Sequence, residues 1–497
     1  MKVTIKNPSK AYIDADPVIL EGMKKDFSYR KTSVQILLQK HEHKHWLRNS
    51  DPDRWEYEKA ELLRDLDKNL LFQDKGGYWV RPGLLSYLPF SFTLINEISY
   101  PKFKPIPWAK MPEFEPYPYQ SLSMDKMMEA KHACISLPTG CGKSFITQLM
   151  ARNTGLDTVV VTPSESIFNE LLKGFTELLG KKYVGGYGDG KKDLTKKITI
   201  AISKSLANLK EGTPAFDFFA SKQMMIVDES HTFAAETLEE VCHGVLADIP
   251  YRFFLSATQT RGDGTEKLLN SIIGPCVYEM SIDEAISQGY LCPLNFTILQ
   301  TFTPSSLIKK DSIENKREHL LYNKEVAKTA ALIANSKWEN KQESTLILVE
   351  ELRQIKLIID LLKVPYGYVH SGSKKDAAVW GLEQVDSQEQ VDRFNKGEIR
   401  VLIGTRAIAT GTNLYPTHNT INCVGGSSEI ITKQGTMGRS TRKLEISKYK
   451  HLHKPKPATM IYDFDITNNP KLKAQLKKRI EWYKEANGTI DTFNLMV

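Results

Sequence analysis

The sequence predicts an α/β protein built on two successive, mostly parallel β-sheets. Short apolar runs of strand length recur from residue 133 to residue 464, and helical patterns separate them. Such alternation is typical of parallel sheets whose faces are covered by helices. The runs form two series with a join near residues 289–298, so we expect two lobes.

The strand-like runs set the limits of the two lobes. In the first series they are residues 133–137, 158–162, 198–202, 223–227 and 252–256, with helical stretches at 143–153 and 165–179. In the second they are residues 345–349, 366–370, 399–403, 420–424 and 459–464, with helical stretches at 353–363 and 387–397. We place the lobes at residues 113–292 and 293–468.

The two ends of the chain differ from the lobes. Residues 1–112 predict a small α+β accessory domain, in which a charged helical pattern at 52–71 precedes an aromatic, glycine-containing stretch at 76–90. The proline-dense residues 101–119 are typical of an extended linker. Residues 469–497 are expected to form a basic C-terminal helix.

Composition favours a protein of the reducing cytoplasm. Of the 497 residues, 41% are hydrophobic and 25% are charged, which is ordinary for a globular protein. No apolar run has the length of a membrane span, and the first residues do not resemble a signal peptide. The six cysteines include no C-x-x-C pair, which argues against a zinc ribbon or a disulfide frame. The net charge of +8 favours a polyanionic partner only weakly.

Residues 137–144, LPTGCGKS, have the features of a phosphate-binding loop. Gly140 and Gly142 permit a tight backbone, Lys143 can reach phosphates, and Ser144 can ligate a metal ion. The stretch lies between a strand-like run and a helical one, as the motif requires. The generic motif has glycine where this chain has Leu137.

Two carboxylates follow the strand-like run at 223–227. Asp228 and Glu229 would lie at the carboxyl end of a neighbouring strand, where Mg²⁺ needs a ligand and the attacking water needs a base. An acidic turn that only faces solvent is the alternative, and the phosphate loop upstream argues against it.

Several stretches, in order, resemble the motifs of superfamily-two helicases and translocases. PTGCGKS, DESH and SAT are similar to motifs I, II and III, and motif I of that family requires no glycine at Leu137. TLILVEELRQ, IGTRAIATGTNL and QGTMGRSTR are similar to motifs IV, V and VI. The resemblance spans residues 116–465 and implies two tandem RecA-like lobes that use ATP and Mg²⁺.

The resemblance also implies roles for individual residues. Tyr117 and Gln120 would contact the adenine, and Gly411 would lie against the nucleotide. The nucleotide would also contact the whole loop, namely Pro138, Thr139, Gly140, Cys141, Gly142, Lys143 and Ser144, with Ser144 and Asp228 on the metal. His231, Ser256 and Thr258 would couple motif II to motif III.

Motif VI contributes the remaining catalytic candidates. Gln434 would contact the attacking water or the γ-phosphate. Arg439 and Arg442 are three residues apart, so on a helix they would share a face. If they come from the second lobe, ATP is fully contacted only when the lobes close, and hydrolysis opens them.

Translocation along nucleic acid requires contacts to the sugar–phosphate backbone. By resemblance, the candidates are Thr162, Ser164, Glu165, Ser203, Lys204, His370, Ser371, Thr405 and Arg406. Each is also an ordinary turn or cap residue, so these assignments depend on the family likeness.

Two features of the first hundred residues have competing interpretations. His41 and His45 are spaced like metal ligands on a helix, although a basic, partly exposed helix that touches phosphate is favoured because no partner carboxylates follow. Trp79 and Arg81 are either a wedge at a DNA fork or part of a packed aromatic core.

The N-terminal aromatic stretch, the compact motor and the basic C-terminal helix resemble phage branch-migration helicases of the UvsW type. This implies a monomeric, cytoplasmic enzyme that remodels branched or forked DNA, with the accessory domain binding DNA; if the chain is phage-encoded, the compartment is the host cytoplasm. An ATPase clamp or switch that unwinds nothing, and an RNA helicase, remain alternatives.

Overall fold

The chain folds into two compact units. The structure, a computed structural model, describes residues 1–88, 91–112, 115–233, 235–256, 266–301, 312–405, 408, 413–429, 431–445 and 447–495, without the side chains of Thr32, Ser33, His231, Ala235, Ser312, Ile431 and Gln434. Residues 1–136 and 142–279 form the first unit. Residues 137–141 and 280–497 form the second.

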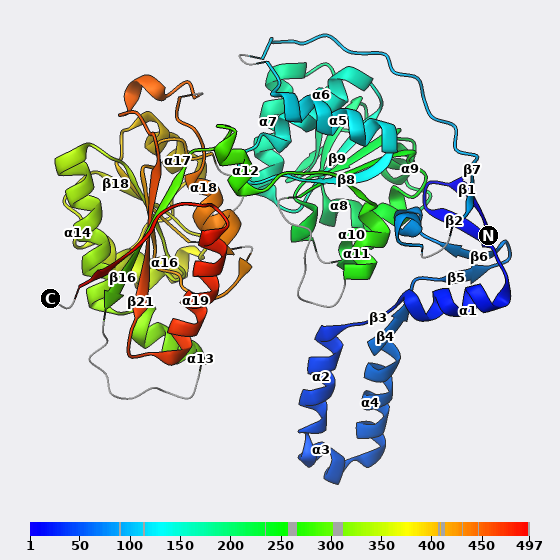
Figure 1. The fold of residues 1–497 in the computed structure, drawn as a ribbon, viewed down its shortest axis with the longest axis horizontal. Helices are drawn as coiled ribbons and strands as arrows, with labels where there is room; N and C mark the ends of the chain where they lie inside the picture. The colour runs from blue at the N-terminus through cyan, green and yellow to red at the C-terminus, as the bar shows by residue number, and fades with distance from the viewer. Residues whose placement is uncertain are drawn as a thin grey trace. The chain divides into compact units, whose positions relative to one another are not determined.

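The first unit contains an eight-stranded sheet in the order β11-β10-β12-β9-β13-β14-β8-β15 (Figure 1). Its strands are β8 (His132–Ser136), β9 (Thr158–Thr162), β10 (Val184–Gly188), β11 (Lys191–Lys192), β12 (Ile198–Ile202), β13 (Met224–Val227), β14 (Tyr251–Ser256) and β15 (Cys276–Glu279). All neighbours pair in parallel except β10 and β11. The residues of β9 are buried on both faces, as expected for a strand inside a helix-covered parallel sheet.

Helices follow these strands as the alternation predicts. They are α5 (Pro118–Ala130), α6 (Lys143–Thr154), α7 (Glu165–Leu179), α8 (Ser203–Ala207), α9 (Pro214–Ala220), α10 (Ala235–Glu240) and α11 (Glu266–Ile273). In α7, Ile167, Phe168, Leu171 and Phe175 are buried, which is the helical spacing of a core-facing stripe.

A smaller module precedes this sheet in the same unit. Its five strands have the order β5-β6-β2-β1-β7 and are β1 (Lys2–Asn7), β2 (Lys10–Asp14), β5 (Phe72–Asp74), β6 (Gly77–Val80) and β7 (Thr93–Asn96). Helix α1 (Pro17–Asp26) and the 3₁₀ helix η1 (Pro82–Tyr87) flank them. The expectation of a small α+β element here is met.

A helical hairpin projects from this module (Figure 1). It consists of α2 (Thr32–Glu42), α3 (His45–Ser50) and α4 (Pro52–Leu66), and β3 (Ser28–Arg30) pairs with β4 (Asp67–Asn69) at its base. Val34, Leu38 and Leu66 form its small core.

The module and the eight-stranded sheet share one apolar core. Val3, Ile13 and Val80 belong to the same buried cluster as Leu268 and Ile272 of α11. Polar contacts reinforce this packing, because the Ser9 hydroxyl donates to the carbonyl oxygen of Ala247 at 2.6 Å. The module therefore forms one body with the first lobe.

The proline-dense linker is extended, as expected, and follows the surface of the first unit. The backbone N–H of Lys104 donates to Thr154 O at 2.8 Å, and that of Ile106 donates to Arg152 O at 3.0 Å. Gly155 permits this close approach, because a Cβ there would lie 1.9 Å from Lys104 O. The linker is thus fixed to the lobe along this stretch.

The second unit contains a seven-stranded parallel sheet in the order β18-β19-β17-β20-β21-β16-β22. Its strands are β16 (Leu294–Thr301), β17 (Thr345–Leu348), β18 (Tyr366–Val369), β19 (Val401–Gly404), β20 (Asn419–Asn422), β21 (Thr459–Ile466) and β22 (Ile490–Asn494). The helices include α12 (Ile282–Ser287), α13 (Ser312–Lys316), α14 (Lys324–Lys341), α15 (Leu352–Ile359), α16 (Lys374–Val379), α17 (Ser387–Lys396), α18 (Gly438–Ser440) and α19 (Pro470–Lys484).

The C-terminal segment forms more than the expected helix. After α19, β22 pairs in parallel with β16 and becomes the edge strand of the sheet. Arg479 of α19 is buried, and its Nε donates to Asp463 Oδ2 at 2.7 Å. The segment is therefore part of the second unit's core.

The limit between the lobes was expected at residue 292. Contacts instead group residues 280–292 with the second unit. The physical reason is that Ile282 and Ile286 of α12 pack against the cluster that contains Leu294 and Phe296. The expected limits at 112 and 468 stay predictions.

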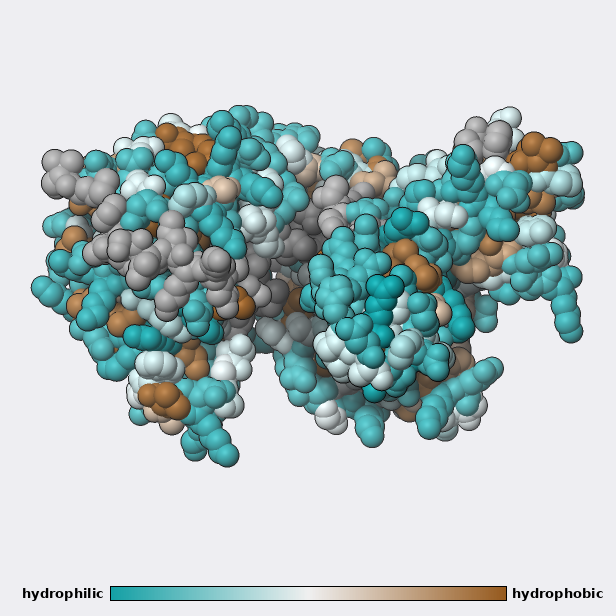
Figure 2. Space-filling model, turned by 90° about the horizontal axis from the view of Figure 1, so that it is seen from below, coloured by the Kyte–Doolittle hydropathy of each residue, from teal (hydrophilic) through white to brown (hydrophobic). Residues whose placement is uncertain are grey.

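The molecular surface drawn in Figure 2 is mostly hydrophilic, with separate apolar patches. Isolated apolar residues at a surface are normal in globular proteins. No helix among the described residues is long and apolar enough to span a bilayer.

Candidate nucleotide and nucleic-acid site

The phosphate loop joins β8 to α6, as the sequence predicts. Gly140 and Gly142 have φ values of 98° and 70°, which L side chains rarely adopt. Gly142 is the N-cap of α6, so Lys143 and Ser144 occupy its first turn. Backbone N–H groups at a helix N-terminus bind anions, so the loop has the local form of a phosphate cradle.

Gln120 lies directly against this loop. Its side chain is buried, and its Oε1 accepts a hydrogen bond from the backbone N–H of Tyr117 at 2.9 Å. A Cβ at Gly142 would lie 2.5 Å from Gln120 Nε2. Tyr117 stacks on Tyr119 with ring centroids 5.9 Å apart. The fold thus brings Gln120 next to the loop, and Tyr117 is joined to Gln120 by a hydrogen bond.

The two carboxylates of motif II lie at the carboxyl end of β13, next to Lys143. Lys143 Nζ is 3.6 Å from Glu229 Oε1, and Lys143 and Asp228 are both buried. Burial raises the pKa of Asp228, repulsion from Glu229 raises it further, and Lys143 opposes these effects. Glu229 has a φ of 50°, a strained value that turns its side chain out of the strand direction.

This environment fits a divalent cation. A buried carboxylate whose charge is disfavoured by a second carboxylate is stabilised by an added positive charge. Asp228 and Ser144 are the residues that would hold the ion, and oxygen ligands are those that Mg²⁺ prefers. Among the described residues, no cluster of three or more His, Cys, Asp or Glu side chains offers a second metal site.

A connection between motifs II and III runs through Ser230. The Ser230 hydroxyl donates to the carbonyl oxygen of Leu255 at 3.3 Å, and Ser256 beside it is buried at the end of β14. This coupling was expected to involve His231, Ser256 and Thr258, and Ser230 adds a contact beside Ser256 that was not expected. The His231 side chain and all of Thr258 lie outside the described residues.

Motif VI lies in the second unit, in the π-helical turn η6 (Ile431–Met437) and α18. Arg439 is buried within α18. The expectation that Arg439 and Arg442 share a helix face is wrong, because α18 ends at Ser440, and Arg442 follows its cap, Thr441. The side chain of Gln434 and all of Gly411 lie outside the described residues.

Buried polar groups hold the end of α18. Lys456 Nζ donates to Ser440 O at 3.0 Å, and Thr459 Oγ1 donates to the same oxygen at 2.8 Å. The hydroxyls of Thr420 and Ser440 are 2.7 Å apart. A cation at the C-terminus of a helix is electrostatically favourable. Lys456 is thus placed to position the arginines of motif VI, a role that the sequence analysis missed.

The candidate backbone-binding residues of the first unit differ in exposure. Thr162 and Ser203 are buried, so their side chains face the protein. The Ser164 hydroxyl caps α7 by accepting from Ile167 N at 3.5 Å. Glu165 and Lys204 are exposed. Glu165 starts α7 and Lys204 lies in the first turn of α8, where backbone N–H groups are available to phosphate.

In the second unit, the candidates follow the carboxyl ends of β18 and β19. His370 and Thr405 are buried, and Ser371 is exposed. His370 Nε2 lies 3.3 Å from the carbonyl oxygen of Glu383. Arg406 lies outside the described residues.

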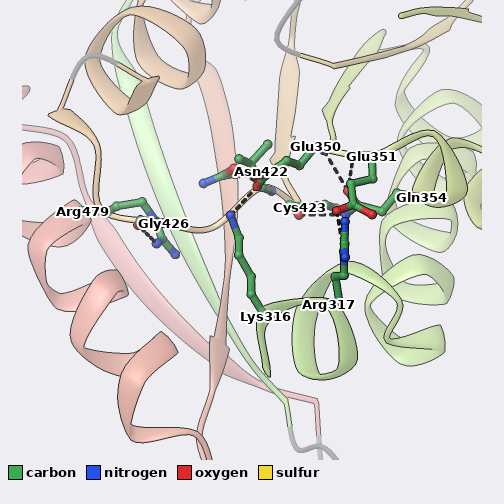
Figure 3. A network of polar contacts seen from close by, with 10 residues as sticks. Lys316, Arg317, Glu350, Glu351, Gln354, Asn422, Cys423, Gly426 and Arg479 are labelled. Carbon is green, nitrogen blue, oxygen red and sulfur yellow. Dashed lines mark hydrogen bonds and ion pairs between the residues drawn. The ribbon is translucent and has the colours of Figure 1, made fainter. Parts of the chain in front are cut away.

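A polar network organises the carboxyl ends of β17 and β20 (Figure 3). Gln354 Oε1 accepts from the backbone N–H groups of Glu350 and Glu351 at 2.8 and 3.1 Å, and its Nε2 donates to Cys423 O at 3.0 Å. Arg317 Nε lies 2.7 Å from Glu351 Oε1. These contacts fix motif IV to the strand that precedes motif VI, which its spacing alone did not reveal.

His41 and His45 do not share a helix, because α2 ends at Glu42 and α3 begins at His45, so the expected metal-ligand spacing on one helix is wrong. His41 is buried, stacks on Trp55 with ring centroids 5.2 Å apart, and its Nε2 lies 2.9 Å from Trp55 O. It is a core residue of the hairpin. Arg81 is also buried, pairs with Glu239 of α10 and donates to Ser271 Oγ at 3.3 Å. The wedge interpretation is therefore wrong for Arg81, which joins the module to the first lobe.

Comparisons with known proteins agree with these motifs. Residues 113–261 match the family described as "Type III restriction enzyme, res subunit", and residues 325–443 match the "Helicase conserved C-terminal domain". A protein named DNA 3'-5' helicase XPB from Kineococcus radiotolerans is 23% identical over 336 residues, 65% of this chain and 57% of that protein. The ATP-dependent DNA helicase uvsW of Enterobacteria phage T4 is 21% identical over 348 residues, 66% of this chain and 66% of that protein. Both matches span less than two thirds of the relative's length.

A solved structure shows the same fold. The fragment of a putative HsdR subunit of a type I restriction enzyme from Vibrio vulnificus YJ016 is 17% identical, with a TM-score of 0.54, and the match covers 77% of this chain and 70% of that chain.

Proposed function

Because the chain belongs to the superfamily-two helicases, with two RecA-like helicase domains, we propose that it is an ATP-dependent DNA helicase or translocase. The observation that carries the proposal is the cluster at the phosphate loop, where Lys143 lies 3.6 Å from Glu229 beside the buried Asp228. Phosphoryl transfer needs a cation, a metal ligand and a group that orients water, and these three side chains supply them.

Each candidate site residue has a defined task in this proposal. Lys143 contacts the β- and γ-phosphates, and Glu229 orients the attacking water. Asp228 and Ser144 hold Mg²⁺, which neutralises charge that develops on the phosphates. Gln120 and Tyr117 recognise the adenine. Arg439 and Arg442 approach the γ-phosphate when the two lobes close on ATP.

DNA is the favoured track because the relatives named above carry DNA helicase in their names. We further propose that branched or forked DNA is the preferred substrate, that a monomer acts, and that it acts in the cytoplasm, of the host if the chain is phage-encoded. The module of residues 1–96 and the basic stretch at 471–478 are candidates for additional DNA contacts.

The test is ATP turnover by the full chain, with and without forked, duplex and single-stranded DNA and with RNA. We expect stimulation by DNA, largest for forked DNA, together with strand displacement or junction migration. Turnover without movement would support a clamp or switch instead. Stimulation by RNA alone would reject a DNA motor.

A further inference from the structure

A cationic hollow lies at the amino-terminal edge of the second unit's sheet. It has a volume of about 270 Å³ and is lined by Trp338, Gln342, Arg400, His451, Leu452, His453 and Lys454, and we call it the Arg400 hollow. Arg400 directly precedes β19, and Gln342 lies shortly before β17. The candidate Thr405 follows the opposite end of β19, and the polar network around Gln354 follows the opposite end of β17. The hollow is therefore separate from both.

The lining carries positive charge and no carboxylate. Arg400 lies over the Trp338 ring with its guanidinium carbon 4.2 Å from the centroid. Its guanidinium makes no hydrogen bond or ion pair with any residue that the structure describes. Burial alone lowers its pKa.

Two fully buried arginines of the chain direct guanidinium N–H groups at protein acceptors. Arg479 pairs with Asp463, and Arg252 donates to Leu246 O at 2.9 Å and Cys242 O at 2.6 Å. Arg400 is half-buried without such acceptors, although its planar fork of donors matches phosphate geometry. A bound anion would supply the hydrogen-bond acceptors that the protein does not offer to Arg400.

The loop that forms one wall of the hollow is basic. Residues 448–456 read KYKHLHKPK, and Lys448, Lys450 and Lys454 are exposed. Lys454 is anchored by its backbone, because His418 Nε2 lies 3.0 Å from its carbonyl oxygen. Lys454 Nζ donates to Lys341 O at 3.2 Å, which keeps the ammonium group near the hollow.

We propose that the Arg400 hollow binds a phosphate group of a nucleic-acid backbone, outside the path gripped by the motor motifs. Arg400 and Lys454 supply the charge, and the Gln342 amide and the His451 ring can add donors. The assignment of the phosphate to nucleic acid rests on the proposed function, whereas phosphate binding itself does not.

His453 makes this binding depend on pH. Its Nε2 lies 2.7 Å from Asn395 O, and its pKa is lowered by burial and by the nearby Arg400, His418 and His451. Glu398, the carboxylate nearest to Arg400 in sequence, lies 3.5 Å from Arg393, and Glu343 beside Gln342 lies 3.9 Å from Lys337. A bound phosphate favours the charged imidazole, so DNA binding should tighten as the pH falls below the ordinary histidine pKa of 6.5. Phosphodiesters do not titrate in this range.

The experiment uses the full chain and two variants of the hollow. One combines His451→Gln with Lys454→Gln, which are both exposed, and the other is Arg400→Gln. The matched control combines Lys324→Gln with Lys328→Gln, which are both exposed near the start of α14. Duplex DNA binding is measured against salt at pH 6 and pH 8, and pyrophosphate binding is measured with ADP saturating the nucleotide site.

We expect both hollow variants to bind pyrophosphate at least about tenfold more weakly than the control. Their slope of log K against log salt should fall by about 1 for each lost phosphate contact. Unchanged pyrophosphate binding and an unchanged slope would overturn the proposal. Lost pyrophosphate binding with an unchanged DNA slope would show that the ligand is a free phosphate compound, which overturns the nucleic-acid assignment.

A failure of phosphate binding in the hollow can be told apart from a failure of the proposed helicase function. DNA-stimulated ATP turnover is measured separately on the unaltered chain. If that stimulation is absent, the DNA motor is rejected, while the pyrophosphate comparison still decides whether the hollow binds phosphate.

Discussion

Lys143 lies beside the carboxylate of Glu229, and in the proposed function both groups have a second task once ATP binds. There the phosphates would attract the ammonium group of Lys143, which would leave Glu229 to orient water. Burial raises the pKa of Asp228, and repulsion from Glu229 raises it further, so the pair favours any arrangement that adds a cation. The strained backbone at Glu229 is consistent with a site whose geometry serves chemistry.

Glu229→Gln should therefore abolish ATP turnover while it preserves folding. We expect the rate to fall by at least about 10²-fold, because the water loses its orienting group, and the melting temperature to stay the same or rise, because a buried repulsion is removed. The exposed Glu211→Gln serves as the control. Near-normal turnover in Glu229→Gln would refute the role of Glu229.

Lys456 supports a prediction about pH. Burial lowers its pKa to about 8, from an ordinary value near 10.5. Between these values the unfolded chain binds more protons at this site than the folded chain, so this residue makes stability rise with pH. We compare the free energy of unfolding of the unaltered chain with that of Lys456→Met. The first minus the second should increase by on the order of 1 kcal/mol per pH unit from pH 8 to pH 10. A difference that stays flat would contradict it.

Lys456→Met should also affect catalysis through α18. Since Lys456 Nζ donates to Ser440 O, its loss should loosen the segment that carries Arg439 and Arg442. We expect kcat to fall while the KM for ATP changes little, as measured by steady-state turnover. A rise in KM with an unchanged kcat would argue against a positioning role.

The residues of motifs I and II could be predicted because a few neighbouring residues determine their geometry. The phosphate loop depends on glycines within three residues of Lys143, and DESH directly follows its strand. Ser230 and Lys456 could not be predicted, because their partners, Leu255 and Ser440, lie many residues away in sequence. Arg442 was misplaced because nothing in its neighbours indicated that the helix ends at Ser440.

At the scale of secondary structure, the most consequential unpredicted element is β22. Its sequence, IDTFN, is short and polar, and gave no strand signal. It forms a strand by pairing with the edge of β16. This pairing satisfies backbone groups of β16 that would otherwise favour association with other chains. The buried apolar strands, in contrast, could be predicted from their composition alone.

Gly488 is the residue that allows β22 to reach β16. A Cβ at this position would lie 1.8 Å from Leu294 O, a backbone atom that cannot move aside easily. We expect Gly488→Ala to lower the melting temperature of the second unit by several degrees. Gly22→Ala is the control: it lies inside α1 with nothing within 4 Å, so it should stabilise slightly. Equal effects of the two changes would refute the packing argument.

The contact of Arg81 with α10 predicts how the N-terminal module behaves. Arg81 is buried and pairs with Glu239. Arg81→Ala removes the cation beside the Glu239 carboxylate, so we expect it to detach the module from the first lobe. Limited proteolysis should then cut faster within residues 97–116. Arg30→Ala removes an exposed pair with Asp67 and should leave cleavage unchanged. The same cleavage rate in both variants would contradict the docking role.

At the scale of the whole molecule, the candidate catalytic side chains of motifs I and II lie in one unit and the candidate arginines lie in the other. Lys143, Asp228 and Glu229 belong to the first unit, and Arg439 and Arg442 to the second. In the proposed function, such a division would let ATP binding and hydrolysis change the relation between the two units. The N-terminal module shares the first unit's core, so it should follow the first lobe through this cycle.

From this division we predict that substitutions can separate closure of the two lobes from hydrolysis of ATP. Arg442→Ala should reduce the hydrolysis rate by roughly 10³-fold or more, as loss of an arginine finger does, while ATP still binds the first unit. A fluorophore pair on exposed positions, Lys182 in the first unit and Lys473 in the second, should report a shorter distance when a non-hydrolysable ATP analogue is added. Lys143→Ala should abolish that change, since the phosphates would lose their main cation. If Arg442→Ala instead hydrolyses ATP normally, or if the two labels do not approach on nucleotide binding in the unaltered chain, the second unit does not complete the site and the motor mechanism fails.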